Sequence, residues 1–166
     1  WMAGTSPAMT ASERQSALAG VRRARADEAE KSAAFQHAAY AKNNEILGVP
    51  SVPLLADYAQ VLADYEVWVA DDNDDYAGVL ILELQPDDLL IWSIATAANA
   101  RQCGLGRQML AASEERARAH GRTRMTLYTG APLKGNIAWY QRHGYVILGT
   151  EVRPERSIVH MAKELG

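Results

Sequence analysis

The chain has 166 residues, of which 48% are apolar, and its formal net charge is −3. This length supports one domain with its own hydrophobic core, and the composition is typical of a soluble globular protein. The net charge argues against a general nucleic-acid-binding protein. Cys103 is the only cysteine, which excludes an intrachain disulfide, and no apolar run has the length of a membrane span. We therefore expect a cytoplasmic protein that binds neither nucleic acid nor membranes.

Residues 1–16 are expected to form a disordered leader, and residues 17–166 the folded domain. Trp1 stands before Met2, which suggests a cloning remnant, and the residues that follow show no apolar periodicity. The first element, over Leu18–Arg25, is a strand candidate. Its arginines are typical of a solvated strand at the edge of a sheet.

Two helices are predicted next. The first runs from about Glu28 to Lys42, after Asp27, which is a good N-cap residue. A loop over Asn43–Pro53 follows, because its glycine and its prolines interrupt a helix. A second helix begins at Pro53, and apolar residues repeat at helical spacing beyond it.

Three strands then form an antiparallel meander over Glu66–Ala70, Tyr76–Gln85 and Leu89–Thr96. Pro86–Asp88 turns the chain between the last two strands. The acidic run Asp71–Asp75 joins the first two strands and lacks the central glycine and the terminal glutamate of an EF-hand loop. It therefore predicts a turn rather than a metal site.

The second half of the chain begins with a helix from Leu105 to about His120. On this helix we expect apolar residues to face inward and charged residues, Arg116 among them, to face outward. A strand, a short helix and a closing hairpin follow, over Arg124–Thr129, from Asn136 to Gly144, and over Tyr145–Val152 and Ser157–Ala162. The strand–helix–strand crossover makes Arg124–Thr129 parallel to the strand before the long helix. The predicted fold class is α/β of the α+β type: a single domain with a mixed, mostly antiparallel sheet and about four helices.

The loop Arg101–Gly106 lies between an apolar strand and the long helix. Backbone N–H groups at a helix N-terminus lack partners and, together with the helix dipole, bind anions such as phosphate. Gly104 and Gly106 leave room for an anion, and Arg101 and Arg107 can donate to phosphate oxygens. The loop matches neither the Walker A motif nor a complete dinucleotide fingerprint. It predicts a diphosphate site, and a glycine-rich turn that only caps the helix is the alternative.

The same loop reads R-x-x-G-x-G and resembles the pyrophosphate loop of the GNAT superfamily of N-acetyltransferases. A second segment resembles the other GNAT signature, with a shorter spacing between its asparagine and its tyrosine than in many members; the matching residues are Asn136, Tyr140, Gly144 and Tyr145. The two signatures occur in the order expected for the superfamily. The resemblance covers most of the chain, from about Val21 to Ala162.

The resemblance implies that acetyl-CoA binds where the central parallel strands splay apart. The backbone of Ile94, Ala95 and Thr96 would hydrogen-bond the pantetheine arm as though it were another strand. Asn136 would contact the thioester end, and the diphosphate would lie on the amides of the loop. The expected cofactor-binding residues are Ile94, Ala95, Thr96, Arg101, Gln102, Cys103, Gly104, Leu105, Gly106, Arg107, Asn136 and Tyr140. No metal is expected.

The resemblance also implies transfer of the acetyl group to a primary amine of a small molecule or a protein, by direct attack. A backbone N–H near Ile94 or Ala95 is the candidate donor to the oxyanion. Tyr140 occupies the position of the family's general acid, and its ordinary pKa of ~10 suits protonation of a thiolate of pKa ~8.5. The alternative is that Tyr140 only binds the sulfur. Glu83 is a candidate base and Ser93 a candidate for orienting a water, and neither role is assigned.

The sequence does not identify the acceptor amine. By family analogy the amine approaches over the loop after the first helix and over the hairpin near Arg153, and candidate lining residues are Tyr40, Glu45, Trp68, Trp92 and Tyr128. A nucleophilic Cys103 would need a histidine partner, and none is indicated, so its backbone is the expected phosphate contact. The alternative function is a non-catalytic acyl-CoA-binding regulatory module. Pairing into a homodimer through the terminal strands is also consistent with the sequence.

Overall fold

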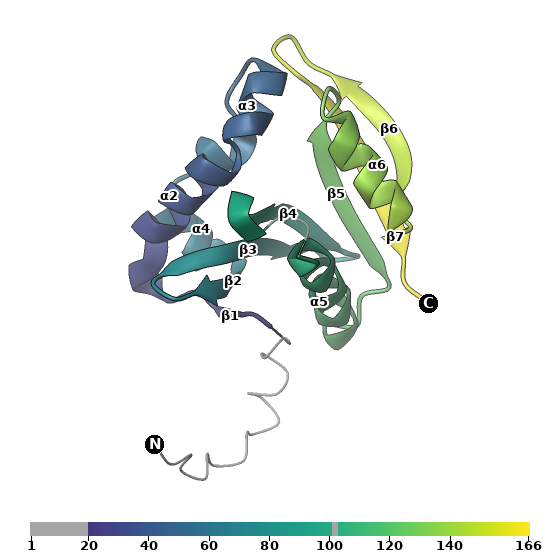
Figure 1. Cartoon of the computed structure of the whole chain (residues 1–166). Coiled ribbons are helices and arrows are strands. Elements are labelled where there is room, and N and C mark those ends of the chain that lie inside the picture. Colours follow the sequence, from purple (N-terminus) through teal and green to yellow (C-terminus); the bar gives the residue numbers. More distant parts are fainter. Residues whose placement is uncertain (1–19, 101–102) are drawn as a thin grey trace.

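The computed structural model describes residues 20–100 and 103–166, so the predicted leader lies outside the described residues. The described chain forms a seven-stranded sheet in the order β1-β2-β3-β4-β5-β7-β6 (Figure 1). Its strands are β1 (Arg22–Arg23), β2 (Glu66–Asp72), β3 (Asp75–Leu84), β4 (Leu89–Thr96), β5 (Arg124–Gly130), β6 (Val146–Val152) and β7 (Ser157–Glu164). The α-helices are α2 (Ala29–Ala39), α3 (Ala41–Leu47), α4 (Tyr58–Asp64), α5 (Leu105–Ala119) and α6 (Lys134–Arg142). Short 3-10 helices are η1 (Ala26–Glu28), η2 (Val52–Leu54) and η3 (Ala98–Ala100).

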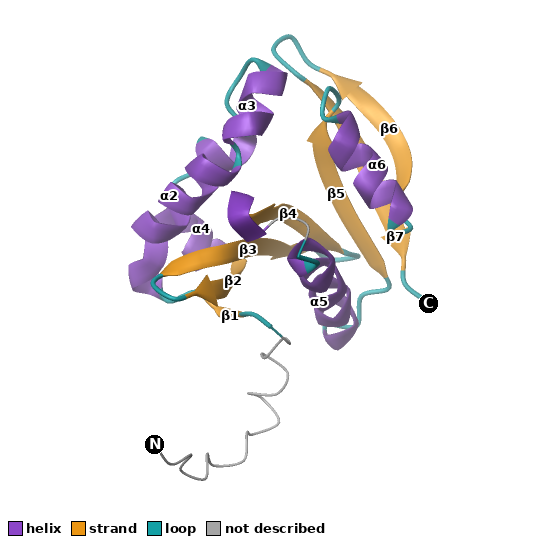
Figure 2. Cartoon of the chain, viewed as in Figure 1, coloured by secondary structure: helices purple, strands orange, loops and turns teal. Residues whose placement is uncertain are grey.

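Helices cover both faces of the sheet, because apolar side chains alternate in direction along its strands (Figure 2). On β2, Val67 and Val69 face the layer of α2 and α4, whereas Trp68 faces α5. The buried cluster on the α2–α4 side also holds Tyr58 and Ile81. The cluster on the other side joins α5 and α6 to the centre of the sheet. The predicted α+β domain with a mixed sheet is confirmed.

The parallel strands β4 and β5 part halfway along their length. Their pairing covers only Leu89–Ile91 of β4 and Met125–Leu127 of β5. Beyond these residues, β4 stays paired with β3 as far as Thr96, and β5 stays paired with β7 as far as Gly130. The sheet therefore opens into a V (Figure 1). Among the described strands, none pairs with the second half of β4 on the β5 side, so the predicted splayed pair is confirmed.

A β-bulge shapes the second half of β4. Ile81 of β3 pairs with Ser93, and the next residue, Leu82, pairs with Ile91, so Trp92 is the extra residue. A bulge sets two residues of one strand opposite one residue of its partner. Trp92 packs against the α2–α4 cluster, and Ser93 accepts a hydrogen bond from α2. The bulge therefore brings two successive side chains to the same face of β4.

The predicted first helix is wrong at its C-terminal end. The helix breaks at Tyr40, and α3 then continues through Asn43 and Asn44 to Leu47. The side-chain oxygen of Asn44 accepts hydrogen bonds from the backbone N–H and the hydroxyl of Ser51, at 2.8 and 2.9 Å. Asn44 therefore ties the following loop to the helix instead of ending the helix.

Other predicted boundaries shift by a few residues. α4 begins at Tyr58 and not at Pro53, which lies in η2, because the Asp57 carboxylate caps the helix with a hydrogen bond of 3.0 Å to its first turn. β2 extends through Asp72 into the predicted acidic turn. α6 begins at Lys134, earlier than predicted. β1 covers only 2 residues of the predicted first strand.

Arg116 does not face solvent as predicted, since it is only 8% exposed. Its Nε lies 2.7 Å from Oε1 of Glu66, and its Nη2 lies 3.2 Å from Oε2. The same carboxylate accepts a hydrogen bond from the indole N–H of Trp68 at 3.1 Å and lies 3.0 Å from Nε2 of His120. Burial alone would raise the pKa of Glu66, but these partners outweigh burial and lower it. The Glu66 carboxylate at the start of β2 therefore holds the Arg116 guanidinium of α5 toward the sheet.

Glu28 links η1 to β1. Its carboxylate accepts hydrogen bonds from the Arg22 guanidinium at 2.8 and 3.0 Å and from the Arg25 backbone N–H at 2.6 Å. The contact with Arg22, helped by that with Arg25, lowers the pKa of Glu28 from 4.5 to about 2. A carboxylate with a lowered pKa stabilises the fold above its unfolded pKa, and this stabilisation is lost as the pH falls toward the folded pKa.

We expect the free energy of unfolding to fall by on the order of 2–3 kcal/mol between roughly pH 5 and pH 2 through Glu28 alone. Urea denaturation across this range measures the effect. Glu28→Gln should reduce the fall in the free energy of unfolding between pH 5 and pH 2. Glu164→Gln should leave this fall unchanged, because the side chain of Glu164 is 74% exposed. An equal fall in the free energy of unfolding in the wild type and in Glu28→Gln would contradict the prediction.

Gly78 of β3 supports the first turns of α5. A Cβ at this position would lie 2.9 Å from Cε of Met109 and 3.1 Å from Cδ2 of Leu105. Met109 is fully buried and has little room to move. We expect Gly78→Ala to destabilise the protein by about 1–3 kcal/mol through overpacking.

Chemical denaturation tests the Gly78 prediction against Gly149→Ala on β6. A Cβ at Gly149 would meet nothing within 4 Å. The control should therefore change the free energy of unfolding by less than about 1 kcal/mol. Comparable losses in both variants would show that strand glycines matter for backbone conformation and not for the fit of α5.

Candidate functional site

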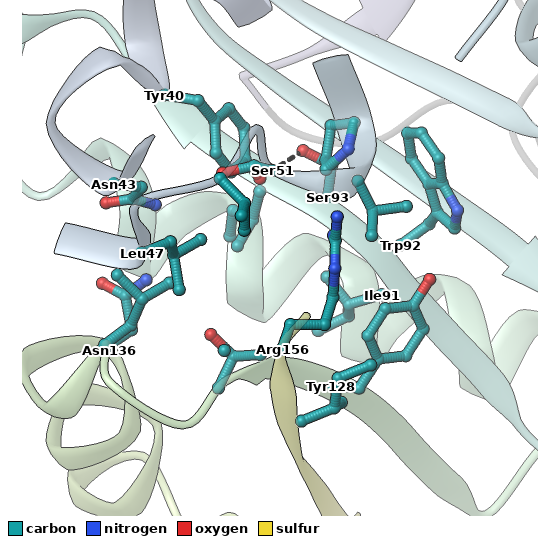
Figure 3. Close-up of a pocket in the computed structure, with 18 of the residues that line it drawn as sticks. Tyr40, Asn43, Leu47, Ser51, Ile91, Trp92, Ser93, Tyr128, Asn136 and Arg156 are labelled. Carbon is teal, nitrogen blue, oxygen red and sulfur yellow. Dashed lines mark hydrogen bonds between the residues drawn. The ribbon is translucent and has the colours of Figure 1, made fainter. Parts of the chain in front are cut away.

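Three hollows meet at the unpaired half of β4. The α5–α6 hollow lies between the start of α5 and α6 and includes Gly104, Gly106, Arg107 and Tyr140. The α3–α6 hollow lies between α3 and the start of α6 and includes Asn43, Ala95 and Lys134. The α3–β7 pocket is enclosed by α3, β4, β5 and the start of β7 and includes Tyr40, Trp92, Tyr128 and Arg156 (Figure 3). Ile94 and Asn136 line all three hollows.

The predicted diphosphate loop stands at the N-terminus of α5. Gly104 is the N-cap, with φ of +82°, a conformation that glycine adopts readily. A Cβ on Gly106 would lie 3.5 Å from Cζ2 of Trp139, an ordinary contact, so α5 and α6 lie close together at this glycine. Arg107 is exposed and lines the α5–α6 hollow. The end of α5 thus presents backbone N–H groups to a hollow large enough for a ligand.

Of the other described loop residues, Leu105 and Cys103 do not line this hollow. Leu105 turns inward and packs against the hydrophobic core. Cys103 is exposed, which leaves its backbone as the predicted contact. Arg101 and Gln102 lie outside the described residues. The structure therefore brings Gly104, Gly106 and Arg107 to the hollow.

The predicted strand residues follow the edge of β4 that faces the opening. Ile94 and Thr96 line the α5–α6 hollow, and both also line the α3–α6 hollow together with Ala95. All three residues lie beyond the pairing with β5. An extended ligand placed along this edge would meet a strand with open hydrogen-bonding groups.

Tyr140 and Asn136 project from α6 toward this edge. Tyr140 is 8% exposed and lines both the α5–α6 hollow and the α3–β7 pocket. Its ring packs edge-on against Trp139 and Tyr145, at centroid distances of 5.0 and 5.6 Å. Burial, with a smaller contribution from Tyr40, raises the pKa of Tyr140 well above its ordinary value. The phenol is therefore protonated throughout the physiological pH range.

A buried polar network supports the wall of the α3–β7 pocket. Ser93 accepts a hydrogen bond from Nε2 of Gln36 at 2.8 Å, and its hydroxyl lies 2.8 Å from that of Tyr40 (Figure 3). Burial raises the pKa of Tyr40 to about 12, so this group also stays neutral. Sequence reasoning identified Tyr40 and Ser93 and missed Gln36, because one glutamine on a helix carries no signal of burial.

The structure brings some of the residues predicted for the acceptor side together in one pocket and leaves others outside it. Tyr40, Trp92 and Tyr128 line the α3–β7 pocket. Trp68 does not, because the alternation along β2 turns it into the core beneath α5, where it is 1% exposed. Glu45 is exposed on α3, and Glu83 lines none of the three hollows.

Arg156 lines the pocket although the sequence drew attention to Arg153 in the same turn. The side chain of Arg153 is 53% exposed and pairs with Glu151, at 2.8 Å from Nε to Oε1. No sequence signal separates the two arginines, because only the start of β7 decides which one faces inward.

Within residues 20–100 and 103–166, no group of three or more His, Cys, Asp or Glu side chains is placed to hold a metal ion. No helix in this part of the chain is long and apolar enough to cross a membrane.

Solved structures share this fold at low sequence identity. PaiA N-acetyltransferase from Thermoplasma acidophilum, solved in complex with coenzyme A, is 12% identical with a TM-score of 0.72, over 87% of this chain and 97% of that chain. The ribosomal-protein-S18-alanine N-acetyltransferase from Escherichia coli is 16% identical with a TM-score of 0.70, over 88% and 93% of the two chains. IAA acetyltransferase from Bacillus cereus is 20% identical with a TM-score of 0.65, over 87% and 98%.

The sequence itself matches a family model. No curated protein matches the chain. The model of the acetyltransferase (GNAT) family matches residues 23–145. This range runs from the last residue of β1 to just beyond α6 and includes the glycine loop, the open edge of β4 and Tyr140. The chain therefore belongs to the GNAT acetyltransferase family.

Proposed function

We propose that the protein transfers the acetyl group of acetyl-CoA to a primary amine by direct attack of the amine on the thioester carbonyl. The observation that carries this proposal is the meeting of three hollows at Ile94 and Asn136, with Tyr140 in the wall between two of them. A long ligand entering from α5 and a second substrate entering from the α3–β7 pocket would meet at this point. Membership of the family supports the same reaction.

The residues present fit acetyl-CoA as a substrate. The N–H groups at the start of α5 and the Arg107 guanidinium supply donors for a diphosphate. The open edge of β4, from Ile94 to Thr96, supplies backbone groups for the amides of the pantetheine arm. Asn136 lies where all three hollows meet, so we assign it to the thioester end. Arg101 and Gln102 stay predicted diphosphate contacts.

The chemistry needs a donor for the oxyanion and a proton for the leaving thiolate. The amine must attack as the neutral base, forming the C–N bond while the C–S bond breaks. A backbone N–H near Ile94 or Ala95 is the proposed donor to the carbonyl oxygen. Tyr140 is the proposed general acid, because burial keeps it protonated and because it borders both substrate hollows.

Release of coenzyme A thiol from acetyl-CoA, measured across a panel of small amines, amino acids and peptides, tests the function. Turnover that requires both acetyl-CoA and an amine is the expected result. Binding of coenzyme A without turnover on any acceptor would instead support a non-catalytic acyl-CoA-binding module. Absence of coenzyme A binding by calorimetry would overturn the assignment of the α5–α6 hollow.

A further inference from the structure

The α3–β7 pocket has one charged residue in its lining. Among the described residues that line it, Arg156 carries the only charge, and the others are apolar, aromatic, hydroxyl or amide side chains. Lys134, Arg107 and Arg142 line the other two hollows instead. The pocket is therefore positive, although the chain as a whole has a net charge of −3.

The guanidinium of Arg156 is available to a ligand. Figure 3 shows its side chain extending into the pocket. Within residues 20–100 and 103–166, no carboxylate pairs with it, whereas Arg22, Arg116 and Lys163 each pair with a carboxylate. Arg153, in the same turn, already pairs with Glu151. An unpaired guanidinium facing a largely neutral pocket costs desolvation energy that a bound anion would offset.

The chemistry of the pocket favours a carboxylate. A guanidinium presents two parallel N–H groups that match the two oxygens of a carboxylate. A single guanidinium balances one negative charge, whereas a phosphate dianion calls for further cations or for a nest of backbone N–H groups, and such groups lie at α5 instead. A second cationic group on the acceptor would be repelled, and the low polarity of the surroundings strengthens both effects.

The shape of the pocket favours a small acceptor. A Cβ on Gly130 at the end of β5 would lie 2.6 Å from Cδ2 of Leu47, so α3 reaches across the V and touches β5. Leu47 and Gly130 both line the α3–β7 pocket, so the contact between α3 and β5 forms part of its wall. A pocket walled by α3, β4, β5 and the start of β7 suits a small acceptor better than an extended polypeptide.

We propose that the acceptor is a small amino acid, a primary amine that carries a carboxylate, and that Arg156 binds the carboxylate. This inference rests on the proposed function. The carboxylate lies at Arg156, and the amine points toward Ile94 and Tyr140, where the acetyl group is transferred. Tyr40, Trp92 and Tyr128 contact the body of the acceptor between these two ends.

The experiment compares acceptors and variants together. Thiol release is measured with the twenty common α-amino acids, with the carboxamide and the decarboxylated amine of each, and with short peptides. We expect Arg156→Gln to lower kcat/KM for the amino acid by about 10- to 100-fold and to change that for the carboxamide by less than about threefold. Comparing the two enzymes with the same acceptor removes the effect of the different amine pKa values.

Arg153→Gln is the matched control, because it removes an arginine from the same turn without touching the pocket. It should change every kcat/KM by less than about twofold. Binding of coenzyme A by Arg156→Gln should equal that of the wild type, which shows that the variant is folded. Equal losses for the amino acid and its carboxamide, or efficient acetylation of only decarboxylated amines or peptides, would overturn the carboxylate site and leave the acetyltransferase proposal standing. Absence of thiol release with every acceptor, whether or not it carries a carboxylate, would instead overturn the proposed function.

Discussion

Replacing Tyr140 with phenylalanine should lower kcat by about 10²- to 10⁴-fold, the range that general acid catalysis contributes in enzymes. The hydroxyl is the only group removed, and the aromatic ring keeps its contacts with Trp139 and Tyr145. The dissociation constant of coenzyme A should therefore change by less than about threefold. Pre-steady-state measurement of thiol release, with coenzyme A binding by calorimetry, separates the two effects.

Tyr145→Phe is the matched control for this prediction. Tyr145 is 2% exposed, and its hydroxyl is buried without a hydrogen-bond partner among the described residues. Removing it should leave kcat unchanged. An equal loss in both variants would assign the effect to packing, and normal turnover by Tyr140→Phe would limit Tyr140 to binding the sulfur.

The pH dependence of the wild type gives a second readout of Tyr140. Burial raises the pKa of its phenol, so deprotonation of this acid should not reduce kcat/KM below about pH 10. The rate should instead rise with pH as the acceptor amine becomes neutral. A decline that begins near pH 8 and disappears in Tyr140→Phe would contradict a strongly raised pKa.

Replacing Glu66 with alanine should lower the free energy of unfolding by about 3 kcal/mol. Removing one partner of a buried ion pair leaves the other charge without its counterion. The side chains of Glu66 and Arg116 are 15% and 9% exposed, and the carboxylate also contacts His120 and Trp68. Urea denaturation at pH 7 measures the loss, which is a large share of the stability of a typical domain.

Two comparisons test whether the loss comes from the uncompensated charge. Replacing both partners with apolar residues, Glu66→Leu with Arg116→Met, should recover most of the stability. Glu164→Ala removes the partner of Arg124 in an exposed pair, with side chains 74% and 39% exposed, and should cost less than about 1 kcal/mol. A double variant no more stable than Glu66→Ala would point to packing of the carboxylate and not to its charge.

The order and type of most elements are predictable from the sequence because they are local properties. Alternation marks β2, with Val67 and Val69 on one face, and the glycine loop marks the start of α5. The role of Asn44 is not predictable, because asparagine ends helices in general and here bonds forward to Ser51. The inward turn of Arg116 depends on a carboxylate 50 residues away in the chain, which no local pattern reveals.

The candidate site shows the same division. The residues of the two family signatures could be placed in advance because their spacing is itself the signal. Gln36 and Arg156 could not, since each becomes part of the site only when α2 or the start of β7 packs beside β4. The bulge in β4 could not be predicted either. Leu89–Ala95 is almost uniformly apolar, so the sequence has no alternation that an extra residue would interrupt.

The extra residue at Trp92 is a position that β4 could lose without changing the register of its neighbours. Deleting Trp92 would leave Leu82 opposite Ile91 and Ile81 opposite Ser93, so Ser93 would still face Gln36. The residues from Ile94 to Thr96 would likewise keep their partners on β3. A relative with a gap of one residue here could therefore keep the open edge of β4 and lose only the tryptophan in the wall of the pocket. An alignment of this strand should accordingly be anchored separately on each side of Trp92.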